Sequence, residues 1–281
     1  MARAQFKMLR CAIAGVDAVE AETRHTFPRH THEQFGIGVI HRGAQKSLSG
    51  RGMVEAGPGD AITVNPGEVH DGAPIGDAGR SWRMLYFDPP LIADAARDIS
   101  QGRTSTFEFT RPVIGDPRIA ACFGALFSAM TAGRQDAEDE ATTPAGAQAS
   151  VAREETMLML LAEVMRDGNG FVPDRSMPAP ISVARSLIDD DPAAAITLAD
   201  LARESGLSRF QVLRGFVRAT GLTAHAYILQ RRIAAARRLI AQGRPLAQAA
   251  LESGFADQSH MTRMFVRTYG ISPGAYAEAV G

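Results

Sequence analysis

The last third of the chain contains an imperfect internal repeat. Residues 204–207 read Glu-Ser-Gly-Leu and residues 252–255 read Glu-Ser-Gly-Phe, while Arg-Gly-Phe at 214–216 recurs as Arg-Met-Phe at 263–265. Each copy has the pattern of a helix, a tight glycine turn and a second helix. Two helix-turn-helix units in one chain predict a protein whose second helices enter two successive segments of the DNA major groove.

The two copies differ in spacing and in surface chemistry. The offset between them is 48 residues at the Glu-Ser-Gly turn and 49 residues at Arg-x-Phe, so the second copy has one extra residue around Ala256-Asp257. The exposed positions of the two second helices also carry different residue types. The repeat therefore predicts an asymmetric, bipartite DNA site for each chain.

Charge is distributed unevenly along the 281 residues, although the formal net charge is only −1. Residues 196–281 contain eleven arginines, no lysine and five acidic residues, a net charge of +6. The other 195 residues contain 19 basic and 26 acidic residues, a net charge of −7. Such asymmetry is typical of a basic DNA-facing module joined to an acidic module with a different task.

The chain has no feature of a secreted or membrane protein. Its two cysteines, Cys11 and Cys122, form no disulfide or metal-binding pattern. The N-terminus lacks a signal-peptide pattern, and no stretch reaches the roughly 18 apolar residues that span a bilayer. We expect a cytoplasmic protein with no membrane partner.

The N-terminal part is predicted to be a β-barrel or sandwich. Short apolar stretches separated by Gly-rich and Pro-rich turns predict strands within residues 11–110, at Phe35–Ile40, Ala61–Val64, Trp82–Phe87 and Phe107–Phe109. Helical spacing follows at Ile119–Met130 and Val151–Met165, whose apolar faces are candidates for dimerisation.

The expected fold is α+β with two domains. Residues 1–115 are assigned to the barrel, 116–170 to the attached helical candidate for dimerisation, 171–180 to a linker and 181–281 to an all-helical DNA-binding domain. In that last domain, capping-box patterns at Thr197/Asp200 and Ser208/Gln211 predict two helix starts. A long helix over about 224–241 is expected to join the two units.

The DNA contacts are expected in the first turns of the two second helices. The candidates are Arg209, Phe210, Gln211 and Arg214 in the first copy and Gln258, Ser259, His260, Thr262 and Arg263 in the second. Arg can pair with guanine, Gln with adenine, and an apolar side chain can touch a thymine methyl group. Two alternatives stay open: Phe210 could be partly buried in the core, and His260 could have a capping role.

These residues resemble a known family. The matching segments are Leu198-x-x-Leu201-Ala202, Gly206-Leu207-Ser208, Arg232-Ile233-x-x-Ala236, Asp257-Gln258-Ser259-His260 and Gly270-x-Ser272-Pro273-x-x-Tyr276. Together they are similar to the AraC-type transcriptional regulators over about the last hundred residues. The resemblance implies two helix-turn-helix units joined by a long helix, with base-reading positions at Phe210, Arg214, Gln258, Ser259, Thr262 and Arg263.

The N-terminal half resembles the cupin-like effector domain of the same family. The matching segments are Pro28-x-His30-x-His32, Pro58-Gly59-Asp60 and residues 65–70, which end at His70. In a cupin these segments lie on facing strands, so the three histidines could converge and hold a divalent metal. The glutamate that metal cupins place after the paired histidines is absent, because Gly36-Ile37-Gly38 occupies that region.

A small-molecule pocket in the barrel is the favoured interpretation. Gly36 and Gly38 remove volume from one strand, and Trp82, Met84 and Tyr86 alternate on another. The candidate ligand-binding residues are His30, His32, His70, Trp82 and Tyr86. The alternative is that Trp82 and Tyr86 simply fill the barrel.

The sequence thus predicts a transcription factor, not an enzyme, whose barrel binds a small-molecule effector. Its expected partners are double-stranded DNA, the effector and a second copy of the chain, with RNA polymerase as a further candidate. No cofactor is expected apart from the metal considered above. Two other interpretations remain: a metal-dependent cupin enzyme with an appended DNA-binding domain, and a barrel that serves only to dimerise.

Overall fold

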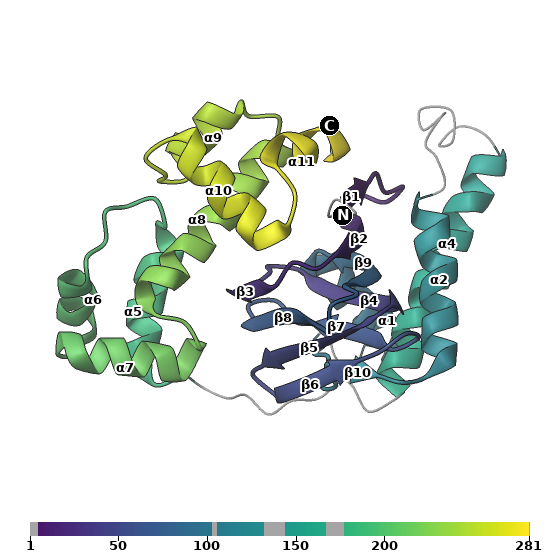
Figure 1. Cartoon of the computed structure of the whole chain (residues 1–281), viewed down its shortest axis with the longest axis horizontal. Helices are drawn as coiled ribbons and strands as arrows, with labels where there is room; N and C mark the ends of the chain where they lie inside the picture. Colours follow the sequence, from purple (N-terminus) through teal and green to yellow (C-terminus); the bar gives the residue numbers. More distant parts are fainter. Residues whose placement is uncertain (1–4, 103–105, 132–143, 167–176, 281) are drawn as a thin grey trace. The chain divides into compact units, whose positions relative to one another are not determined.

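The computed structural model describes residues 5–102, 106–131, 144–166 and 177–280. It divides into two compact units (Figure 1): residues 1–26 and 32–172 form one, and residues 173–281 with 27–31 form the other. Most of the linker expected at 171–180 lies outside the described residues, and helix α5 (Ala179–Asp190) begins just before its end. Within the described residues, no helix combines the length and apolar character needed to cross a membrane.

The strands form two antiparallel sheets, and every strand except β3 belongs to the first unit. The larger has the strand order β1-β2-β9-β4-β7-β10 and the smaller the order β3-β8-β5-β6. The strands are β1 (Gln5–Leu9), β2 (Val16–Thr23), β3 (Phe27–His30), β4 (Phe35–Arg42), β5 (Ala44–Ser49), β6 (Gly52–Ala56), β7 (Ala61–Val64), β8 (His70–Ile75), β9 (Arg80–Phe87) and β10 (Val113–Ile114).

Alternation along β9 divides the large sheet into two faces. Leu85 and Phe87 are fully buried and belong to the apolar core of the unit. That core also contains apolar residues of the helices α1 (Pro89–Ile99), α2 (Pro117–Thr131) and α4 (Pro144–Arg166). Trp82 and Met84 have the opposite parity and are buried on the other face. The sheet therefore has one face on helices and one face toward the candidate effector site.

The apolar faces of α2 and α4 belong to this core. Phe123, Leu126 and Phe127 in α2 and Leu160 and Leu161 in α4 are buried within the unit. These side chains were candidates for pairing between chains, but they are already covered. Contact between two copies would need other residues, such as those exposed around Met159.

Helix α1 was not anticipated, because residues 11–110 were expected to contain only β structure. Asp88 is extended at the N-cap, and Pro89-Pro90 sets the first turn, where a missing backbone N–H costs nothing. Ile92, Ala95 and Ala96 then form a buried stripe at helical spacing. The helix follows directly after β9, and its buried stripe is part of the apolar core of the unit.

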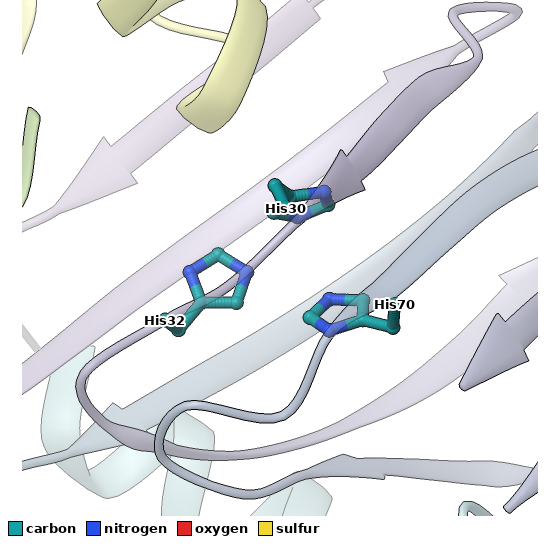
Figure 2. A group of neighbouring side chains, drawn as sticks. All are labelled: His30, His32 and His70. Atoms are coloured by element: carbon teal, nitrogen blue, oxygen red, sulfur yellow. The ribbon is translucent and has the colours of Figure 1, made fainter. Parts of the chain in front are cut away.

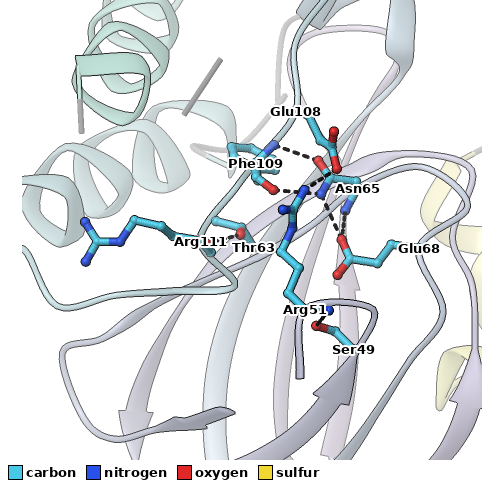
Figure 3. A network of polar contacts seen from close by, with 8 residues as sticks. All are labelled: Ser49, Arg51, Thr63, Asn65, Glu68, Glu108, Phe109 and Arg111. Carbon is cyan, nitrogen blue, oxygen red and sulfur yellow. Dashed lines mark hydrogen bonds and ion pairs between the residues drawn. The ribbon is translucent and has the colours of Figure 1, made fainter. Parts of the chain in front are cut away.

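The strand expected at Phe107–Phe109 is wrong, since these residues have no strand pairing. The side-chain amide of Asn65 supplies the hydrogen bonds instead (Figure 3): its Oδ1 accepts from the N–H of Phe109 at 2.7 Å, and its Nδ2 donates to the Phe109 carbonyl at 2.9 Å. Phe107 and Phe109 are buried and contact Phe35. Their apolar character reflects packing, with no sheet required.

The second unit contains seven helices within the described residues. After α5 come α6 (Leu198–Ser205), α7 (Arg209–Thr220), α8 (Ala224–Ala241), α9 (Leu246–Glu252), α10 (Gln258–Tyr269) and α11 (Pro273–Val280). Both expected capping boxes are present, with Thr197 accepting from the N–H of Asp200 and Ser208 from that of Gln211. Helices α6–α7 and α9–α10 form the two helix-turn-helix units, joined by α8 (Figure 1).

Arg232, on the long helix α8, ties this helix to the loop that precedes the first helix-turn-helix unit. Its guanidinium donates to the carbonyl of Pro192 at 2.7 Å and to that of Ala194 at 3.0 Å, in the loop between α5 and α6. The same loop lies against the turn of the second helix-turn-helix unit, where a Cβ on Gly254 would lie 2.7 Å from Ala193 Cα. Gly254 has φ +84°, so it needs glycine for both conformation and space.

We predict that Gly254→Ala destabilises the helical unit more than Gly206→Ala. Gly206 is also left-handed, at φ +66°, but a Cβ there meets nothing within 4 Å. Strain alone predicts a loss of about 1–2 kcal/mol at Gly206, whereas overpacking adds about 1–3 kcal/mol at Gly254. Hydrogen exchange of peptides from α6, α7, α9 and α10 in the full chain measures both. Equal losses would show that the loop yields to the added methyl group.

Candidate DNA interface and effector site

Helix α7 exposes the expected reading residues of the first unit. Arg209, Phe210, Gln211 and Arg214 are all exposed, and Phe210 is 65% exposed. Phe210 is therefore not a core residue. The Arg214 guanidinium carbon lies 5.6 Å from the centroid of the Phe210 ring, a cation–π arrangement that holds both side chains on one face.

Gln211 has a structural task at this helix start. Its Oε1 accepts a hydrogen bond of 2.8 Å from the N–H of Ser208, and its own N–H donates to Ser208 Oγ. The side chain completes the capping box that begins α7. Reading a base with this amide would compete with the cap.

Helix α10 offers polar side chains in its first turns. Gln258, Ser259 and Arg263 are exposed, and Thr262 is partly exposed. Asp257 caps the helix by accepting from the N–H of His260 at 2.6 Å. The His260 ring is half-buried and packs edge-on against Phe255 at 5.2 Å, so it contributes to the packing of the turn.

The repeat register is visible in the helix caps. The N-caps Ser208 and Asp257 are 49 residues apart, whereas the left-handed turn glycines Gly206 and Gly254 are 48 apart. Each second helix then ends at a left-handed glycine, Gly221 or Gly270. The extra residue in the second unit thus lies between its turn and its N-cap.

Helical spacing in α7 makes Val212, Leu213, Phe216 and Val217 available for packing, but Leu213 and Val217 lie outside the core. They are 45% and 39% exposed, whereas Val212 and Phe216 are fully buried. Only one side of α7 packs against neighbouring helices, and Leu213 and Val217 lie outside that side.

The three histidines of the N-terminal half are brought together. His30 ends β3, His32 follows in the next loop and His70 begins β8, and one nitrogen of each ring lies within 4.8 Å of the others (Figure 2). The His32 ring also lies 4.9 Å from that of Tyr86 on β9. Among the described residues this group contains no carboxylate.

Backbone carbonyls fix the tautomers of two of these rings. His30 Nδ1 lies 2.7 Å from the Pro28 carbonyl and His70 Nδ1 lies 3.1 Å from that of Glu68. A carbonyl only accepts, so each Nδ1 carries the proton and each Nε2 carries a lone pair. Burial lowers the pKa of His70, which keeps its ring neutral at pH 7.

The space opposite Gly36 and Gly38 is filled. A Cβ on Gly36 would meet Met84 Cε at 2.7 Å, and one on Gly38 would meet Met84 Sδ at 2.4 Å. The glycines thus make room for the Met84 side chain, and their missing volume does not by itself form a pocket. Trp82 is also buried, with its ring 5.9 Å from that of Phe6.

Arg80 is a buried cation that the sequence patterns did not identify. It is 1% exposed, and its guanidinium donates to the carbonyls of His25 and Gly72 and lies 4.9 Å from the Trp82 ring centroid. Burial lowers the pKa of Arg80 to about 10. The only sequence signal was its position on β9, two residues before Trp82, which places both side chains on the face of the sheet toward the candidate effector site.

Comparison with known families agrees with this architecture. Residues 13–161 match the AraC-like ligand binding domain, and residues 201–279 match a helix-turn-helix domain. The chain belongs to the AraC family of transcription regulators: its N-terminal domain is a ligand-binding domain and its C-terminal domain binds DNA.

Individual relatives are also regulators. The chain is 27% identical over 238 residues to the HTH-type transcriptional regulator YbfI of Bacillus subtilis, covering 84% of this chain and 81% of that one. It is 42% identical over 84 residues to the transcriptional activator NphR of a Rhodococcus species, covering 30% of this chain and 25% of that one.

Solved structures of ToxT from Vibrio cholerae have the same fold. A ToxT variant in its apo form superposes with a TM-score of 0.59 at 17% identity, covering 97% of this chain and 100% of that one. Wild-type ToxT bound to an unsaturated fatty acid gives 0.56 at 14% identity, covering 99% and 97%.

We predict that Gln211→Ala destabilises α7 by about 1 kcal/mol, because it leaves the N–H of Ser208 without its capping partner. Gln258→Ala is the matched control, since Asp257 caps α10 without help from Gln258. Hydrogen exchange of α7 and α10 peptides measures the effect. Unchanged α7 protection in Gln211→Ala would leave this side chain available for base reading.

Proposed function

We propose that α7 and α10 are the two reading helices and insert their first turns into successive major grooves. The observation that carries this proposal is the equivalence of Arg214 and Arg263. Each is exposed, and each lies six residues after its N-cap, Ser208 or Asp257. Arginine at this place can donate two hydrogen bonds to guanine O6 and N7. Arg209, Gln258, Ser259 and Thr262 are further proposed contacts.

We further propose that a small molecule near His32, His70, Tyr86 and Trp82 controls DNA binding. The proximity of the rings of His32, His70 and Tyr86 supports this location, with Arg80 adding a buried positive charge beside Trp82. ToxT, which shares the fold, has been solved with an unsaturated fatty acid. Such control requires the effector to bind the two functional states with different affinities.

The remaining assignments follow from this role. We propose that the chain acts in the cytoplasm as a homodimer without enzymatic activity, with RNA polymerase as a further partner. The proposed domain limits are 1–115 for the barrel, 116–170 for its helices, 171–180 for a linker and 181–281 for the DNA-binding domain.

We predict that Arg263→Ala lowers affinity for the specific operator by about 1–3 kcal/mol and relaxes selection at one base pair. The operator is first selected from random duplexes with the purified full chain, and affinities are then measured by fluorescence anisotropy at fixed salt.

Arg267→Ala is the matched control, because Arg267 is an exposed arginine one turn further along α10. It should weaken specific and random DNA alike, as expected for a phosphate contact. Equal losses on both kinds of DNA for Arg263→Ala would contradict its role as a base-reading residue.

A divalent metal at His30, His32 and His70 is a second candidate for the barrel. The donor set fits, because two of the rings present Nε2 lone pairs and carbonyls hold their Nδ1 protons. Tetrahedral zinc holds its nitrogen ligands about 3.4 Å apart, so rings within 4.8 Å of one another need only small movements. Three neutral histidines would leave a position on the metal for an effector.

We predict that the full chain binds one Co²⁺ per chain with a visible absorption band, and that His32→Gln abolishes it. His41→Gln is the control, because His41 is an exposed histidine on β4 outside the group. Absence of the band, or its persistence in His32→Gln, would exclude this site and with it the metal-dependent enzyme.

A further inference from the structure

Helix α7 carries an exposed apolar stripe. Phe210, Leu213 and Val217 are 65%, 45% and 39% exposed. Their spacing of three and four residues places them on one side of the helix, next to the buried side that carries Val212 and Phe216. Single exposed apolar residues are common on protein surfaces, but three in one stripe indicate a surface that is covered in use.

The second reading helix differs at two of these three positions. With the 49-residue offset, Phe210 corresponds to Ser259 and Leu213 corresponds to Thr262. Val217 corresponds to Val266, which is 41% exposed, and Arg214 corresponds to Arg263. The two helices therefore share an arginine and a valine, but one adds two apolar side chains and the other adds two hydroxyl groups.

The charges around the stripe favour DNA as its occupant. Arg209, Arg214 and Arg218 are exposed on α7, and the helix contains no acidic residue. This positive surface attracts phosphates. Helix α7 is also the second helix of a helix-turn-helix unit, the element that enters the major groove. The apolar group that DNA presents there is the C5-methyl group of thymine.

We propose that Phe210 and Leu213 read thymine methyl groups, so that the first unit selects T by apolar contact while the second selects bases by hydrogen bonding. The inference rests on the proposed role of α7 as a reading helix. Arg214, held over the Phe210 ring, would then reach a neighbouring guanine. Each bipartite site would contain one half in which methyl groups determine affinity.

The test replaces each thymine of the selected operator, one at a time, with deoxyuracil, which lacks only the methyl group. Wild-type full chain should lose about fourfold in affinity at one or two thymines, all in the same half-site. Thymines in the other half-site should tolerate the change. Because this arm uses unaltered protein, it does not depend on how a variant folds.

Protein variants identify the residues that detect the methyl group. Phe210→Ser with Leu213→Thr, the residues found at the equivalent positions of α10, should bind thymine and deoxyuracil operators equally. Val266→Thr is the control, because Val266 is an exposed apolar residue of α10 that is not among the proposed contacts, and this variant should retain the wild-type sensitivity.

The outcomes separate this inference from the function on which it rests. Failure of the full chain to select any operator would contradict the DNA-reading role itself. If the chain binds its operator selectively but its affinity does not change when deoxyuracil replaces any of the thymines, only the methyl readout is overturned. A double variant whose affinity falls by the same factor for both operators, so that the preference for thymine remains, would overturn it too. So would a double variant that binds DNA normally but changes oligomeric state, which would identify the stripe as a protein interface.

Discussion

The helical unit depends on the attachment of Arg232 to the loop between α5 and α6. One guanidinium on α8 donates to carbonyls of Pro192 and Ala194, and Gly254 lies against Ala193 in the same loop. Loop carbonyls that would otherwise need water gain a charged donor. The attachment fixes the turn between α9 and α10 relative to the loop that precedes α6. The spacing of the two reading helices is therefore a property of the fold.

Much of this unit could be predicted from the sequence because its signals are local. Ser208 and Asp257 cap helices that begin at the next residue, and Gly221 and Gly270 end them in the left-handed conformation that favours glycine. Such signals act within a few residues and do not require knowledge of the tertiary structure. The convergence of His30, His32 and His70 was accessible only through resemblance, since the three come from separate segments.

The errors arose where distant residues decide the outcome. Phe107–Phe109 has the composition of a strand, but its hydrogen bonds go to Asn65, 44 residues away from Phe109. Gly36 and Gly38 remove volume from one strand, but the side chain of Met84, on another strand, fills the space that they leave. Helical spacing makes Leu213 available for packing, yet which side of α7 is covered depends on its neighbours, and Leu213 is exposed. Apolar character alone does not show whether a side chain packs in the core or is exposed at a binding surface.

The separation of buried and exposed positions on the reading helices has an evolutionary consequence. Val212 and Phe216 in α7 correspond to Met261 and Phe265 in α10, and all four are fully buried. The residues that differ most in chemistry, Phe210 and Ser259, lie outside those cores. The two helix-turn-helix units can thus differ in the sequence that they recognise while their interiors stay alike, and new operators can arise through surface substitutions that leave folding intact.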